Sequence, residues 1–96
     1  MNSLDQVRSK RDIILQLASK HGARNVRIFG SVARGEAGES SDLDVLVDFE
    51  PGRSLLDQVG FEQDLEDFLG CAVDVVVEGG ISPFLEARIL REAVPL

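Results

Sequence analysis

The chain has 96 residues, of which 44% are apolar and 28% charged, values typical of globular proteins and unlike those of disordered or collagen-like chains. A chain of this length forms one core, so we expect residues 1–96 to be a single domain. It contains no apolar run near the roughly 18 residues of a membrane span and no apolar signal region. The single cysteine, Cys71, cannot form an internal disulfide, which favours a cytoplasmic protein.

Charge is distributed unevenly along the chain. The net charge of −7 disfavours stable binding to nucleic acid, because proteins that bind nucleic acid carry a basic surface. Residues 1–34 hold seven basic and two acidic side chains, whereas residues 35–96 hold 15 acidic and three basic ones. This asymmetry indicates two electrostatically different faces and favours a partner.

The predicted elements alternate between helices and strands. The first is a helix over 3–21 with a capping-box pattern at Ser3 and Gln6, followed by a strand over 25–29 and a loop over 30–41 with one helical turn at 32–34. A second strand over 42–49 leads to a helix between Ser54 and Gly70. A third strand over 71–77 and a helix from Ser82 to about Ala93 complete the chain. The order αβ(loop)βαβα predicts an α/β (α+β) fold, a small mixed three-stranded sheet covered by helices. The second and third strands are expected to be parallel, because a helix connects them.

Three aspartates are predicted on one side of the second and third strands. Side chains alternate between the faces of a strand, so Asp42 and Asp44 share a face, and Asp74 lies on the polar face of the next strand. Aspartate is disfavoured in strands, and two carboxylates about 5 Å apart repel by about 3 kcal/mol at an effective dielectric of about 20. A divalent cation removes that repulsion, and Mg²⁺ prefers carboxylate oxygens together with substrate phosphates. These acids therefore predict a metal site.

A phosphate-binding turn precedes the acids. Gly30 has no Cβ, so a phosphate can approach its backbone closely. Ser31 offers a hydroxyl, and Arg34, three residues further along the same helical turn, can pair with a phosphate. A phosphate cradle beside a cation site is suited to metal-assisted phosphoryl or nucleotidyl transfer.

The Gly-Ser pair at 30–31 and the Asp-Leu-Asp at 42–44 are separated by ten residues. This pattern resembles the Gly-Ser-x10-Asp-x-Asp signature of the DNA polymerase β-like nucleotidyltransferase superfamily. The surrounding Phe-Gly-Ser-Val-Ala-Arg-Gly and Ser-Asp-Leu-Asp-Val-Leu-Val resemble its minimal nucleotidyltransferase (MNT) branch, and Asp74 matches the third acid of the family. The resemblance covers residues 24–77 by motif and the whole chain by size and element order.

The resemblance implies a nucleotidyltransferase fold, ATP as substrate and two Mg²⁺ ions. MNT proteins are antitoxins that transfer AMP from ATP to a tyrosine of an all-helical HEPN ribonuclease toxin. Mapped onto this chain, Gly30 and Ser31 would hold the triphosphate. Asp42 and Asp44 would bind both metals. Asp74 would complete the site of the metal that activates the attacking hydroxyl, and could act as its base.

The chain contains neither Tyr nor Thr, so an acceptor of that type must lie in a partner. Its length also leaves no room for the extra domain of larger superfamily members. Our leading hypothesis is an Mg²⁺-dependent nucleotidyltransferase that modifies a HEPN toxin. One alternative is a binding antitoxin that neutralises its partner by complex formation. Another is transfer to RNA, which an acidic surface disfavours, or to a small molecule such as an aminoglycoside.

Overall fold

The computed structural model describes residues 3–38 and 40–96. In chain order its elements are α1 (Leu4–Arg8), α2 (Arg11–Lys20), β1 (Ala23–Phe29), α3 (Gly30–Arg34), β2 (Leu43–Phe49), α4 (Leu55–Leu69), β3 (Val73–Val77), α5 (Pro83–Glu92) and β4 (Val94–Pro95). Across these described residues the strands form one sheet in the order β3-β2-β1-β4. The predicted α+β fold with a mixed sheet is confirmed, and so is the parallel pairing of β2 with β3 across the helical crossover α4.

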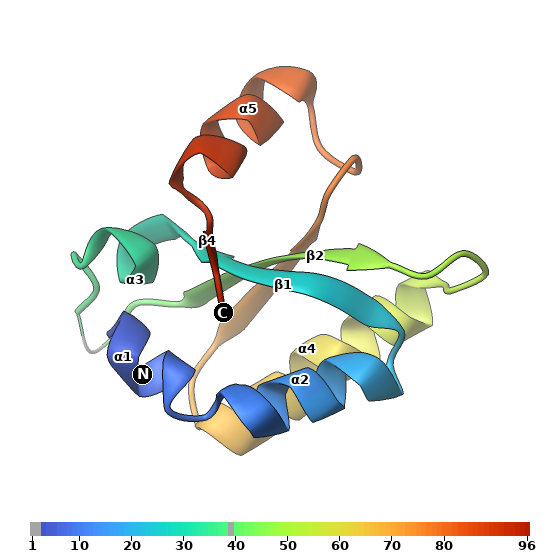
Figure 1. Cartoon of the computed structure of the whole chain (residues 1–96), viewed down its shortest axis with the longest axis horizontal. Helices are drawn as coiled ribbons and strands as arrows, with labels where there is room; N and C mark the ends of the chain where they lie inside the picture. Colours follow the sequence, from blue (N-terminus) through green and yellow to red (C-terminus); the bar gives the residue numbers. More distant parts are fainter. Residues whose placement is uncertain (1–2, 39) are drawn as a thin grey trace.

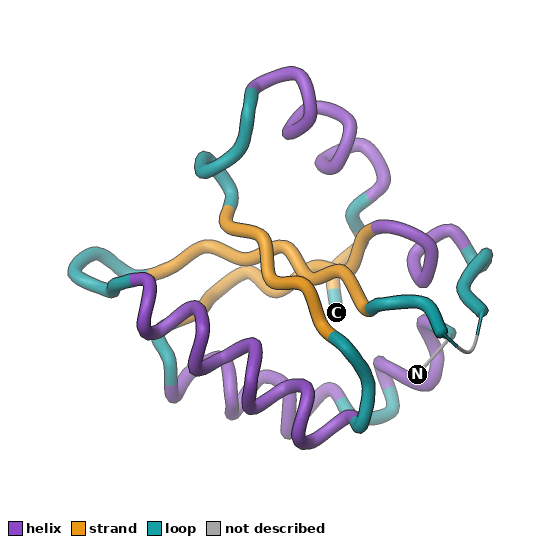
Figure 2. The backbone as a smooth tube through the Cα atoms, turned by 180° about the vertical axis from the view of Figure 1, so that it is seen from behind, coloured by secondary structure: helices purple, strands orange, loops and turns teal. Residues whose placement is uncertain are grey.

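Helices cover the two faces of the sheet unequally. Figure 1 shows α1, α2 and α4 on one face, α5 over the other and α3 beside the end of β1, and Figure 2 shows the same layers from behind. The main core lies between the sheet and the larger helical layer. Its buried members include Ile14, Leu43, Val45, Phe61 and Leu65. A smaller cluster of Phe29, Leu46 and Ile89 lies beneath α5, on the face that carries the candidate site.

The N-terminal segment forms two helices where one was predicted. Ser3 caps α1 by accepting a hydrogen bond from the Gln6 amide, as the capping pattern indicated. Ser9 is the C-cap of α1, and its hydroxyl donates to the Gln6 carbonyl at 2.6 Å. A serine hydroxyl that bonds a carbonyl of the preceding turn competes with the helical hydrogen bonds. This competition explains why the predicted helix over 3–21 is interrupted before Arg11.

The described part of the chain contains a fourth strand, so the expectation of a three-stranded sheet is wrong. In β4, Val94 and Pro95 pair antiparallel with Ile28 and Arg27 of β1. Two residues are too few to show the alternation that predicts a strand, and proline occurs in sheets mainly at edges because it cannot donate to the ladder. The Arg8 guanidinium donates to the Pro95 carbonyl at 2.7 Å, which ties α1 to this edge.

Helix α4 begins and ends where its sequence signals predicted. Ser54 is the N-cap and exchanges hydrogen bonds with Asp57 in a capping box, and Gly70 follows the helix with a φ of 71°. The Ser54 amide donates to the Asp57 carboxylate, which lowers the pKa of Asp57. Among the helices of the described residues, none is both long enough and apolar enough to cross a membrane.

Candidate active site

Two aspartates lie opposite each other on the parallel strands β2 and β3. In the register of this pair Asp44 is the partner of Asp74, and neighbouring strands are about 4.8 Å apart. Leu43 and Val45, on either side of Asp44, are buried in the main core, so the alternation along β2 directs Asp44 to the face covered by α5. The structure therefore brings these two predicted acids together.

The third predicted acid, Asp42, lies one residue before β2 and is exposed. It does not line the pocket that contains the other two acids. Burial raises the pKa of Asp44, and the negative charges of Asp74 and Asp42 raise it further. Glu92 adds to this effect, and Arg34 opposes it. Asp44 is thus a carboxylate whose charged form a bound cation would stabilise.

The turn from β1 into α3 places the backbone against Asp44. Gly30 begins α3 with a φ of 74°, a left-handed conformation that glycine adopts without strain. A Cβ atom here would collide with the Asp44 carboxylate, so glycine is what allows the carboxylate to lie so close to the main chain. Ser31 follows in α3 and lines the same pocket.

Arg34, at the end of α3, is held by two carboxylates. Its Nε donates to Glu36 at 3.1 Å, and its Nη1 lies 3.1 and 3.2 Å from the two carboxylate oxygens of Glu92. These hydrogen bonds raise the pKa of Arg34, the bond to Glu36 most. Glu92 also accepts a hydrogen bond of 2.8 Å from the Gly30 amide. The predicted phosphate-binding groups Gly30 and Arg34 therefore share one carboxylate of the chain itself.

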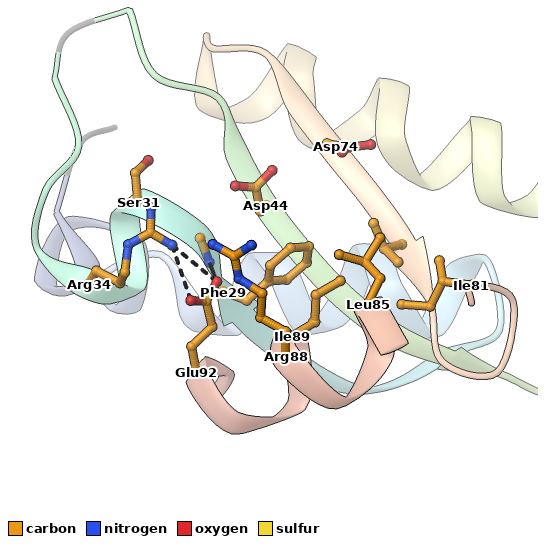
Figure 3. A pocket seen from close by; sticks show the side chains of 12 residues that line it. Phe29, Ser31, Arg34, Asp44, Asp74, Ile81, Leu85, Arg88, Ile89 and Glu92 are labelled. Carbon is orange, nitrogen blue, oxygen red and sulfur yellow. Dashed lines mark hydrogen bonds and ion pairs between the residues drawn. The ribbon is translucent and has the colours of Figure 1, made fainter. Parts of the chain in front are cut away.

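These groups line a pocket of about 420 Å³ on the α5 side of the sheet, shown in Figure 3. The lining residues are Phe29, Gly30, Ser31, Arg34, Asp44, Asp74, Val76, Ile81, Leu85, Arg88, Ile89 and Glu92. In Figure 3, Arg34 and Glu92 lie at one end, and the apolar side chains of Ile81 and Leu85 lie at the other. A pocket that combines apolar walls with a few convergent polar groups is typical of a small-molecule site.

The donor set of this pocket fits a hard divalent cation. Within the described residues, no three His, Cys, Asp or Glu side chains are gathered so that they could hold a metal ion by themselves. Mg²⁺, however, commonly binds through one or two carboxylates and completes its shell with water and substrate phosphates. The facing carboxylates of Asp44 and Asp74 therefore fit Mg²⁺ in combination with a phosphate-bearing substrate.

Sequence reasoning missed the contribution of α5 to the site. Leu85, Arg88 and Glu92 line the pocket, and their spacing of three and four residues places them on one face of the helix. The Arg88 side chain is exposed and makes no ion pair or hydrogen bond with another described residue. Figure 3 shows its guanidinium directed into the pocket beside Phe29. Charged residues on the same helical stripe as the buried Ile89 were the signal that could have indicated this role.

The sequence is similar to that of a known domain family, since the family model described as "Nucleotidyltransferase domain" matches residues 10–96. The chain belongs to the nucleotidyltransferase domain family. This nucleotidyltransferase is 49% identical over 81 residues to MJ0435 of Methanocaldococcus jannaschii, assigned as a protein adenylyltransferase, with 84% of this chain and 87% of the relative covered. It is 43% identical over 79 residues to the protein adenylyltransferase MntA of Thermococcus cleftensis, with 82% and 80% covered.

Solved structures share the fold of this nucleotidyltransferase. One assigned as a minimal nucleotidyltransferase has a TM-score of 0.87 and 53% identity, covering 98% of this chain and 96% of its own. A toxin–antitoxin crystal structure with AMP-PNP has a TM-score of 0.76 at 21% identity, covering 88% and 69%. The structure of a tri-AMPylated Shewanella oneidensis HEPN toxin in complex with an MNT antitoxin has a TM-score of 0.70 at 18% identity, and the match covers 92% of this chain and 69% of the other. The resemblance to the minimal nucleotidyltransferase branch is confirmed.

Proposed function

We propose that this nucleotidyltransferase is an Mg²⁺-dependent protein adenylyltransferase that transfers AMP from ATP to a hydroxyl of a HEPN ribonuclease toxin and so acts as its antitoxin in the cytoplasm. The observation that carries the proposal is the pair Asp44 and Asp74 beside the Gly30 turn in one pocket. The names of the relatives support protein adenylylation. The toxin–antitoxin complexes of the same fold, one with AMP-PNP and one with a tri-AMPylated HEPN toxin, support the nucleotide and the partner.

The proposed reaction joins AMP to the acceptor through a new phosphodiester bond. The acceptor oxygen attacks the α-phosphorus of ATP, the bond between that phosphorus and the oxygen bridging to the β-phosphate breaks, and pyrophosphate leaves with the bonding electrons. Asp74, exposed at the pocket, accepts the proton of the hydroxyl. Asp44 and Asp74 in the pocket, with Asp42 just before β2 as a third proposed ligand, would hold Mg²⁺, whose chemistry is neutralisation of phosphate charge and activation of the attacking oxygen.

The remaining pocket residues bind and orient the nucleotide. The Gly30 amide and the Ser31 hydroxyl donate to the triphosphate. The guanidinium groups of Arg34 and Arg88 pair with its negative charges, since arginine and phosphate form strong charge-assisted hydrogen bonds. The apolar end of the pocket at Leu85 excludes water from one side of the nucleotide.

The acceptor hydroxyl is supplied by the partner. This chain contains no Tyr, and we propose a tyrosine of the HEPN protein as the modified residue. The pocket is open to such an approach, because Asp74, Leu85 and Arg88 are all exposed.

The test is incubation of the purified chain with α-labelled ATP, Mg²⁺ and the product of the neighbouring gene, which the proposal requires to be a HEPN protein. We expect the label on the HEPN protein, and a loss of more than about 100-fold in Asp44→Asn and Asp74→Asn, because several kcal/mol of charge stabilisation is removed. Asp48→Asn is the matched control, since Asp48 lies on β2 outside the pocket. An unlabelled partner with the wild-type chain, or full activity in both site variants, would overturn the proposal.

A second function, neutralisation by binding alone, is favoured by the exposed apolar side chains of this acidic chain. Leu56 is 81% exposed and Phe84 is 89% exposed, and aromatic side chains such as Phe84 are enriched in protein interfaces. If binding alone protects cells, Asp44→Asn still neutralises the toxin at equimolar amounts and forms a stable complex in gel filtration. If catalysis protects, the wild-type chain neutralises an excess of toxin and the variant does not.

A further inference from the structure

Glu92 holds the two groups to which a phosphate would bind. Its carboxylate accepts a hydrogen bond of 2.8 Å from the Gly30 amide and lies 3.1 Å from Nη1 of Arg34. Its side chain is 24% exposed, and Figure 3 shows it at the pocket wall with Arg34 turned toward it. An amide and a guanidinium that converge on one carboxylate form an anion site, and in this structure the anion belongs to the chain itself.

The same donors suit a phosphate oxygen. Carboxylates and phosphates both accept charge-assisted hydrogen bonds from arginine and from main-chain amides, with similar lengths. Glu92 and a phosphate cannot occupy the Gly30 amide together, because one N–H makes one strong hydrogen bond. A triphosphate that enters the pocket would also bring further negative charge toward Glu92, which already repels Asp44.

We propose that the Glu92 carboxylate is an internal anion that occupies the site formed by the Gly30 amide and Arg34, and that a phosphate group of the nucleoside triphosphate replaces it. This inference rests on the proposed function, and it adds a self-occupied state to the nucleotide site. Glu92 keeps Arg34 directed at the pocket before substrate arrives, and it competes with substrate for both donors. It is a positioning residue that lowers the affinity for the triphosphate.

Replacement of Glu92 would also release one end of α5 from α3. Glu92 is the last residue of α5, and its bonds to Gly30 and Arg34 join α5 to α3 at one end of the pocket. Leu85 and Arg88 line the pocket from the same helix. Nucleotide binding would therefore break these contacts between α5 and α3, while Val94, which follows α5, keeps that end of the helix paired with β1.

The opposite role makes the opposite prediction. If Glu92 instead turned toward Asp44 and helped to bind the cation, removing its charge would weaken nucleotide binding in Mg²⁺. Because displacement and metal binding predict effects of opposite sign, one substitution separates them.

The experiment measures binding of ATP and of inorganic tripolyphosphate to the full chain without any partner, by calorimetry, in Mg²⁺ and in EDTA. Glu92→Gln keeps an acceptor for the Gly30 amide but removes the charge that pairs with Arg34. We expect both ligands to bind about two- to fivefold more tightly, the equivalent of losing one partly exposed ion pair. Glu86→Gln is the matched control. Glu86 also lies on α5 and accepts a hydrogen bond of 2.6 Å from a main-chain amide, that of Gly79, but it does not line the pocket. Its affinity should equal that of the wild type.

Unchanged or weaker binding in Glu92→Gln, or equal tightening in Glu86→Gln, would overturn the inference. A second measurement uses the wild-type chain and so does not depend on the fold of a variant. On titration with tripolyphosphate, the NMR signals of the Gly30 amide and of the Glu92 carboxyl carbon should shift together at one Kd, and a shift of Gly30 alone would contradict displacement.

These outcomes are distinguishable from failure of the proposed function. If ATP binds and the HEPN protein is labelled, but Glu92→Gln does not bind more tightly, only the inference fails. If the wild-type chain binds neither ATP nor tripolyphosphate, the proposed function fails and the inference with it.

Discussion

Replacing Gly30 by alanine would test the close approach between the α3 turn and Asp44. Gly30 is the first residue of α3 and Gly35 follows its last residue, and both have a φ of 74°. An added Cβ at Gly30 would collide with the Asp44 carboxylate, whereas at Gly35 nothing lies within 4 Å. Gly35→Ala is therefore a matched control that introduces the same backbone strain without the collision.

The backbone strain should lower stability in both variants, whereas the collision with Asp44 should lower activity in Gly30→Ala alone. A left-handed conformation costs a residue with a side chain about 1–2 kcal/mol, so both variants should lose this much free energy of unfolding. In Gly30→Ala the Asp44 carboxylate must also retreat, and a misplacement on the order of 1 Å in a catalytic group costs about 100-fold in rate. The retreat changes how Asp44 faces Asp74, so the expected loss falls on kcat.

The assay is transfer of label from ATP to the partner, with urea unfolding measured on the same preparations. We expect the two variants to unfold at similar urea concentrations, while only Gly30→Ala loses about 100-fold in activity. Equal activity in the two variants would refute the reasoning, because it would mean that the approach of Asp44 to the main chain does not matter for the reaction.

Three further predictions follow from the contacts of the described residues. Arg88→Gln should weaken ATP binding by about tenfold in calorimetry, because an unpaired guanidinium in the pocket gains most from a phosphate, whereas Arg91→Gln on the same helix, outside the pocket, should not. Gly60→Ala should lower the free energy of unfolding of the wild-type chain in urea, because its Cβ would lie 2.8 Å from the His21 ring, although alanine normally favours a helix by about 1 kcal/mol over glycine. In a His21→Ala chain the same substitution should raise the free energy of unfolding. Equal effects in the two backgrounds would contradict this contact. The hydrogen bond from His21 lowers the pKa of Asp64, so the stability that Asp64 contributes is present above the unfolded pKa of about 4 and is lost as the pH falls through the lower folded value. The stability difference between wild type and Asp64→Asn should therefore shrink in acid, and a difference that grows in acid would show the sign to be wrong.

The parts of the fold that were predictable are those whose signals are local. The alternation of Leu43, Asp44 and Val45 follows the period of a strand, and the same pattern around Asp74 predicted its partner strand. A helical crossover between the two strands then required parallel pairing. Local pattern and connection rules together were enough to predict which face Asp44 would occupy.

The parts that were missed depend on contacts between distant segments. Glu92 is 58 residues from Arg34 along the chain, and no local pattern relates the two side chains. Arg34 was predicted as a phosphate ligand from its helical turn alone, and its carboxylate partner became visible only when α5 was placed over the sheet. The break at Ser9 was missed for a related reason, since a hydroxyl that bonds a nearby carbonyl has the same sequence as one that faces solvent.

The register of β2 against β3 also has a consequence for folding fidelity. Asp44 and Asp74 each lie between residues that the main core buries, among them Val45 and Val75. A slip of either strand by one residue would turn its aspartate into that core and its valines toward solvent. A carboxylate buried without a partner costs several kcal/mol, so the mispaired sheets are strongly disfavoured. The two acids of the candidate site thereby favour the correct strand register. A chain with the wrong register would lose both the packing of its core and the pairing of Asp44 with Asp74.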